Sequence, residues 1–251
     1  MPLPKIDLPV FEIKLISEPN PVKFRPFLVK EEKLLLMALQ SEEEQTILNT
    51  IKQVINNCLI GDIDILKLPI FDIEYLFLNI RARSVGETVD AAYLCNNIVS
   101  TEINESGEEI SSECKHLMHI KINLLDIAPP INNLPTKIYI SKDVGIQLKY
   151  PTLESFKSIK ALILSEKFDQ IYQLIFDCTE YIFDDSNIYY SKESSLEEFT
   201  TFLESLTQEN YDKILEFFNK LPTIKKEINY TCEKCSFEHN LALEGLNDFF
   251  T

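Results

Sequence analysis

The chain has 251 residues, 24 of them basic and 40 acidic, so its formal charge is −16, and only five residues are glycine. An average usage of about 7% would give roughly 17 glycines, and the five present are too scattered for the GxGxxG or GxxxxGKS/T loops that bind nucleotide phosphates. The negative charge also disfavours nucleic acid as a main partner, because binding to its phosphates depends on cationic side chains.

The N-terminal residues 1–9 are predicted to form an extended tail, since three prolines interrupt them. Lys5 and Asp7 break up any apolar core of a secretory signal, and no later apolar run approaches the ~18 residues of a membrane span. We therefore expect no membrane span and a reducing compartment. There, six cysteines indicate metal ligands or buried thiols rather than disulfides.

The first half of the chain, residues 10–127, is predicted to open with a β-hairpin followed by helices. FEIKLI and VKFRPF are typical of two short strands that turn at Pro19-Asn20-Pro21. Apolar periodicity predicts a helix from Leu28 to Leu39 and another after Pro69. Between them, Ser41 to Glu44 has the form of a capping box at the start of a further helix.

The same half ends in a pair of strands that flank two cysteines. TVDAAYLC alternates as a strand into Cys95, and HIKINL alternates as a strand that follows Cys114. Between these strands, residues 101–113 contain five glutamates and no cation. We interpret 101–113 as a solvated loop.

The second half, residues 128–251, is predicted to have the same order of elements. IYI and VGIQLKY form a second hairpin from Lys137, and Pro151-Thr152 is the expected start of a helix. Three further helices are predicted around Phe168–Cys178, Leu196–Leu206 and Tyr211–Leu221, the second of them capped by Ser195 with Glu198. Residues 179–194 are predicted to be a loop.

Matching positions in the two halves indicate an internal duplication. Tyr93-Leu94-Cys95 corresponds to Tyr230-Thr231-Cys232. Apolar residues follow the second cysteine of each pair at six and eight positions: Ile120 and Ile122 after Cys114, and Leu241 and Leu243 after Cys235. Independent recurrence of hairpins and amphipathic helices is the alternative. The predicted fold is α+β, with short antiparallel hairpins and amphipathic helices in two similar halves.

Four cysteines are candidate metal ligands. Cys232-Glu-Lys-Cys235 has the spacing of a zinc knuckle, and Cys95 with Cys114 is a candidate second knuckle whose tip is lengthened by the glutamate-rich insert. Four thiolates complete the tetrahedral shell of Zn²⁺ and leave no position for a catalytic water. The prediction is a structural zinc ion in a zinc-ribbon-like, four-cysteine knuckle pair that joins the halves.

Two other interpretations of these cysteines stay open, namely thiols without metal and a redox pair. A thioredoxin-type pair opens a helix, whereas Cys235 precedes the strand pattern FEHNLAL. Three histidines lie near enough in sequence to replace one cysteine, although surface or supporting roles are favoured: His116, His119 and His239. Cys58 and Cys178 lie on apolar helix faces and are predicted to be core thiols. No residue pattern proposes a catalytic acid–base pair, so we predict no enzyme.

Three segments resemble a known family: KFRPFLVKEEKLLLMAL (23–39), FDIEYLFLNIRARSVGE (71–87) and YTCEKCSFEHNLALEGLNDFF (230–250). They are similar to baseplate hub subunits of T4-like contractile-tailed bacteriophages. The resemblance implies a non-enzymatic structural or assembly component of the tail baseplate, with other hub and tail proteins as partners. It also implies a location in the host cytoplasm during assembly and then in the virion tail. The alternative is a zinc-ribbon module that binds protein or nucleic acid and is unrelated to virions.

Overall fold

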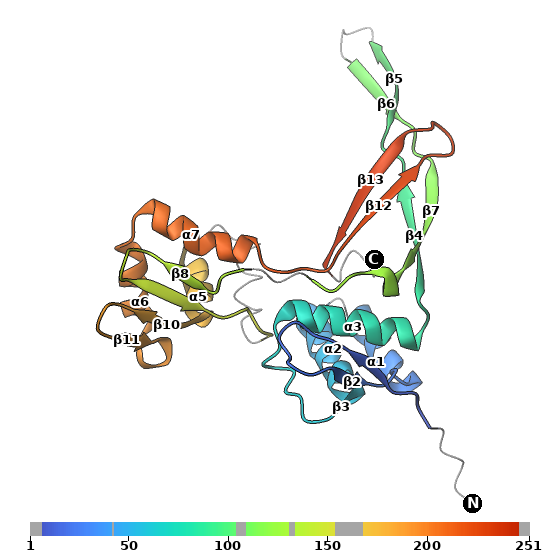
Figure 1. Ribbon diagram of the computed structural model, residues 1–251. Helices are drawn as coiled ribbons and strands as arrows, with labels where there is room; N and C mark the ends of the chain where they lie inside the picture. The colour runs from blue at the N-terminus through green and yellow to red at the C-terminus, as the bar shows by residue number, and fades with distance from the viewer. Residues whose placement is uncertain (1–6, 42, 104–108, 131–133, 154–167, 246–251) are drawn as a thin grey trace, which may run out of the picture.

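The chain folds into two lobes and a stalk (Figure 1). The computed structural model describes residues 7–41, 43–103, 109–130, 134–153 and 168–245. The first lobe forms the base on the right of Figure 1, the second lobe lies on the left, and the stalk of long β-ribbons rises above the first lobe. Within the described residues, no helix combines the length and the apolar character that crossing a membrane requires.

The first lobe is a three-stranded antiparallel sheet packed with three helices. Its central strand pairs with both neighbours, and apolar side chains of the sheet, such as Phe24, meet Ile55 and Leu76 from the helices in one core. The predicted hairpin and helices are confirmed here. The elements are β1 (Phe11–Ile13), β2 (Val22–Phe24), α1 (Val29–Gln40), α2 (Glu44–Cys58), β3 (Leu59–Ile60) and α3 (Ile70–Ser84).

The predicted capping box at Ser41 is wrong. The Ser41 hydroxyl donates to the carbonyl of Ala38 at the end of α1 (2.7 Å) and accepts from the Glu43 amide (3.2 Å). Helix α2 begins only at Glu44, with Glu43 as its cap residue and no side-chain cap. Because Ser41 serves the C-terminal end of the preceding helix, its hydroxyl does not cap the next one.

Glu31 is a buried carboxylate in the first turn of α1. It is fully buried, accepts from the Leu28 amide (2.6 Å) and contacts the Arg25 guanidinium (3.2 Å). Burial opposes ionisation, but the Leu28 amide and Arg25 outweigh it and hold the pKa of Glu31 below its ordinary value of 4.5. The charged form of Glu31 therefore stabilises the fold.

We expect this contribution to depend on pH. Because the pKa of Glu31 is lower in the folded state, its stabilising effect is complete above about pH 4.5 and is lost as the pH falls through the folded-state pKa. Glu31→Gln should lower the free energy of unfolding by about 2 kcal/mol at pH 7. Urea unfolding of both proteins at several pH values tests this; a difference that stays constant below pH 4.5 would contradict it.

In the described residues, the second lobe is a four-stranded antiparallel sheet with strand order β11-β10-β9-β8, packed with three helices. Its core includes Ile146, Ile175 and Phe217. The predicted capping box is confirmed, since the Glu198 amide donates to Ser195 Oγ (3.2 Å) and the Ser195 amide donates to Glu198 Oε2 (2.9 Å). The elements are β8 (Lys137–Tyr139), β9 (Gly145–Leu148), α5 (Phe168–Asp177), β10 (Thr179–Phe183), β11 (Ile188–Tyr190), α6 (Leu196–Glu204) and α7 (Gln208–Asn219).

The prediction of a loop over residues 179–194 is wrong, because β10 and β11 form a hairpin there. Its strands are rich in aromatic and β-branched residues, which favour pleated structure even beside the polar turn at Asp184–Asn187. The helix predicted from Pro151-Thr152 falls mostly on residues 154–167, outside the described residues. Thr152 itself forms a β-bridge to Pro69 of the first lobe.

The two lobes repeat one arrangement of strands. The first hairpin of each lobe receives a third strand, in the order β1-β2-β3 and β8-β9-β10. In each lobe the third strand follows a buried cysteine whose carbonyl accepts from the residue after the second strand: Arg25 donates to Cys58 (2.9 Å) and Lys149 donates to Cys178 (2.8 Å). This correspondence supports the proposed duplication. The burial of both side chains confirms the prediction that Cys58 and Cys178 are core thiols.

The stalk consists of two antiparallel ribbons, one from each half of the chain. Ribbon β4–β7 (Thr88–Leu94 with Leu117–Asn123) lies beside ribbon β12–β13 (Lys225–Thr231 with Glu238–Glu244) in Figure 1. The Tyr93 and Tyr230 rings stack at 6.5 Å between them. Ile122 and Leu243 share a core with Leu78 of α3, which roots the stalk in the first lobe.

An arm extends beyond the top of the stalk (Figure 1). It is the ribbon β5–β6, formed by Ile98–Ile103 and Glu109–Glu113, so the predicted solvated loop over residues 101–113 is wrong at 101–103 and 109–113. Residues 104–108 of that prediction lie outside the described residues. The loop was predicted from the glutamates, but this segment also contains the β-branched residues Ile98, Val99 and Thr101, which favour strands.

Candidate metal centre

Four cysteines meet at the top of the stalk. Each lies just beyond the end of a stalk strand: Cys95 follows β4, Cys114 precedes β7, Cys232 follows β12 and Cys235 precedes β13. Their Sγ atoms all lie within 4.8 Å of one another. The structure thus brings together all four cysteines that the sequence singles out.

The spacing of the sulfur atoms suits one tetrahedral ion. Metal–sulfur bonds of about 2.3 Å place the sulfurs of a tetrahedral site about 3.8 Å apart. The observed separations are 3.6 Å between Cys95 and Cys235 and 3.9 Å between Cys114 and Cys232. Three of the cysteines are buried and Cys235 is partly exposed. Because each of these two contacts joins one ribbon to the other, a shared ion would connect both halves of the chain.

The two cysteine loops have the same backbone. In each, the first cysteine bonds across the ribbon, and the residue after the second cysteine has a left-handed conformation, with φ of 51° at Lys115 and 58° at Ser236. This turn directs the second cysteine back toward the first. The bonds are Cys95 N to His116 O (2.9 Å), Lys115 N to Cys95 O (2.9 Å), Cys232 N to Phe237 O (2.8 Å) and Ser236 N to Cys232 O (2.8 Å). The long insert therefore leaves the geometry of its knuckle intact.

The surroundings of the cysteines, including hydrogen-bond donors directed at sulfur, change the pKa values of the thiols. Burial raises the pKa of Cys95 to about 12. Burial also acts on Cys235, but the Phe237 backbone and the Asn97 side chain, whose Nδ2 lies 3.5 Å from Sγ, lower its pKa to about 6. One thiolate therefore forms readily in this cluster, and a bound dication would favour deprotonation of the remaining thiols.

His239 also contacts the cluster. Its Nε2 lies 3.2 Å from Cys95 Sγ, and its ring stacks on Tyr230 at 4.9 Å. His119 is exposed on β7 and His116 is partly buried, and neither belongs to the four-cysteine group. The prediction of a supporting role fits His239. Asn97 was missed in the sequence, where its only signal is its place two residues after Cys95.

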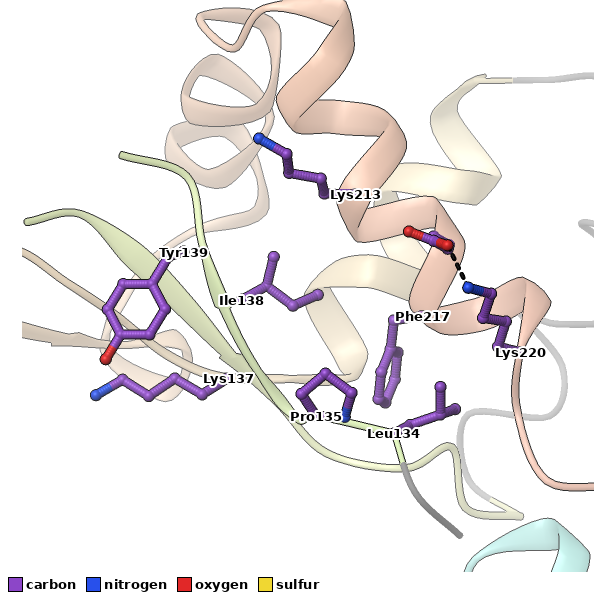
Figure 2. A pocket seen from close by; sticks show the side chains of 9 residues that line it. Leu134, Pro135, Lys137, Ile138, Tyr139, Lys213, Phe217 and Lys220 are labelled. Carbon is purple, nitrogen blue, oxygen red and sulfur yellow. Dashed lines mark hydrogen bonds and ion pairs between the residues drawn. The ribbon is translucent and has the colours of Figure 1, made fainter. Parts of the chain in front are cut away.

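A separate pocket lies in the second lobe between β8 and α7 (Figure 2). It has a volume of about 330 Å³ and an apolar floor that includes Ile138 and Phe217. Three lysines stand around it, Lys137 on the strand, Lys213 on the helix and Lys220 directly after the helix. Lys213 pairs with Glu209 and Lys220 with Glu216. The nine lining residues include no histidine, cysteine or serine.

Comparison with known proteins gives one match. A family model described as T4 bacteriophage base plate protein matches residues 8–251. No curated protein and no solved structure matches the chain.

Proposed function

The chain belongs to the family of T4 bacteriophage base plate proteins, and from this premise we propose that it is a non-enzymatic structural or assembly component of the baseplate hub. The observation that carries this proposal is the family match over nearly the whole chain. The fold supports it, because separate small cores hold two lobes and a stalk in an extended arrangement that suits contacts with several neighbours.

Other hub and tail proteins are the proposed partners. The chain would meet them in the host cytoplasm during assembly and remain with them in the virion tail. Its proposed organisation is a tail of residues 1–9 followed by two halves, 10–127 and 128–251. The separate cores of the lobes and the repeated strand order support this division.

A structural zinc ion bound by Cys95, Cys114, Cys232 and Cys235 is part of the proposal. The sulfur spacing and the two matching knuckle backbones support it. Four thiolates satisfy zinc completely, so the ion would act by linking the ribbons rather than by activating water. Residues 95 and 235, far apart in sequence, would then be held at one point.

Mass spectrometry of tails purified from the phage that encodes this chain tests the hub assignment. The expected result is peptides from this chain, at a constant ratio to other baseplate proteins, in washed tails. If the chain is absent from mature tails but present in baseplate intermediates, only the assembly role stands. Absence from both would contradict the proposal.

A further inference from the structure

The arm is an insertion into one of two otherwise equal knuckles. Between Cys232 and Cys235 the chain has two residues, Glu233 and Lys234, whereas 18 residues, 96–113, separate Cys95 from Cys114. The backbone bonds around both pairs are the same. A closed knuckle therefore does not need the insert, and the arm requires a different reason to exist.

The arm has few stabilising contacts of its own. Strands β5 and β6 pair only with each other in the described part of the chain, so each has an open edge. An isolated two-stranded ribbon is marginally stable in water, and open edges are sites for pairing with another chain. Such a ribbon gains stability when a partner covers it.

Apolar side chains are exposed at the root of the arm. Ile98 and Val99 at the start of β5 are 57% and 51% exposed. Just below them on the stalk, Leu94 and Leu117 face each other across β4 and β7 and are 64% and 50% exposed. These four large apolar residues, each within four positions of Cys95 or Cys114 and at least half exposed, are typical of an interaction surface.

The negative charge of the arm indicates which class of partner it binds. Residues 101–113 carry five glutamates and no lysine or arginine. One of them, Glu113, pairs with Ile98 at the apolar root. A phosphate backbone or an anionic membrane would be repelled by this charge. A protein surface with lysines or arginines around an apolar patch complements it, and complementary charge speeds and orients association.

We propose that the arm, the ribbon of strands β5 and β6, docks on a basic and partly apolar surface of another baseplate protein. Cys95 and Cys114 lie at the two ends of the arm. A metal ion bound by both would therefore fix the position of the root of the arm relative to the stalk. This inference rests on the proposed function, since it assumes that the chain assembles with baseplate proteins.

A knuckle swap tests the inference. In the swap, residues 98–113 are removed, so that Asn96-Asn97 becomes a two-residue tip like Glu233-Lys234 of the second knuckle and the Asn97 donor to Cys235 is retained. The purified protein is added to extracts of cells infected with phage lacking this gene. The swapped protein should keep the zinc content and thermal unfolding of the unmodified protein. It should yield at least tenfold fewer infectious particles than the unmodified protein in the same extract.

Matched charge variants separate the arm from net charge. In one, all five arm glutamates, Glu102, Glu105, Glu108, Glu109 and Glu113, become glutamine. In the other, five exposed glutamates elsewhere become glutamine: Glu180, Glu193, Glu197, Glu204 and Glu227. Both change the formal charge from −16 to −11, yet only the arm variant should reduce particle yield.

The outcomes distinguish the two proposals. A swapped protein that holds metal and restores particles as well as the unmodified chain would overturn the docking role of the arm. Equal losses from both charge variants would overturn the charge argument. If the unmodified protein itself restores no particles, the proposed function fails, and the arm is not the cause.

Discussion

Cys232→Ser is expected to abolish stoichiometric zinc binding and to destabilise the stalk. The Cys232 Sγ is buried 3.9 Å from that of Cys114. A serine side chain there would be too short to complete the four-ligand shell of the zinc ion, and its oxygen would be a poor ligand for that ion. Structural zinc contributes on the order of 10 kcal/mol to the folding of small zinc domains. We expect zinc to fall from one per chain to less than a tenth, measured by elemental analysis, together with a lower unfolding temperature.

Cys178→Ala is the matched control for this experiment. Cys178 is also buried, but it lies in the second lobe, outside the four-cysteine group. The control should keep one zinc per chain even if its stability falls slightly. Unmodified protein that is folded and free of zinc would contradict the proposed centre. A Cys95→Ser protein that keeps its zinc would show instead that the pair flanking the arm does not bind the ion.

The cysteine cluster was the most predictable feature of the site. Two cysteine pairs, each between alternating strands, place their sulfurs at ribbon ends, and matching apolar spacing after Cys114 and Cys235 indicated that both ribbons have the same build. The clustering is now a feature of the structure, whereas metal binding stays a proposal. The contact of His239 with Cys95 was not predictable, because it depends on how two ribbons from opposite halves pack.

Two of the errors in the predicted fold share one physical origin. Residues 101–113 and 179–194 were interpreted from their charge and polar turns, but β-branched and aromatic residues decide strand formation in both. Burial depends on distant partners: Glu31 and Glu32 lie in the first turn of α1, where acidic side chains are usually solvated, yet Arg25 and the Leu28 amide hold the Glu31 carboxylate inside the lobe. Local composition predicts the element, and long-range partners decide burial.

His239→Ala is expected to weaken zinc binding about 10- to 100-fold while the four cysteines remain in place. A zinc-bound Cys95 is a thiolate and can only accept hydrogen bonds, so in that state His239 Nε2, 3.2 Å from its Sγ, would donate. Loss of this donor leaves sulfur charge less stabilised and Cys95 less well oriented. Competition with a chromophoric chelator measures the affinity. His119→Ala, which removes an exposed histidine from β7, should leave the affinity unchanged.

Two further substitutions at position 239 separate the donor from the ring. His239→Phe keeps an aromatic ring that can stack on Tyr230 but has no donor, whereas His239→Gln has an N–H donor but no ring. If the hydrogen bond is the cause, the glutamine variant should bind zinc more tightly than the phenylalanine variant. The reverse order would show that His239 supports the site by packing, because the stacked ring then positions β13 and Cys235 with it.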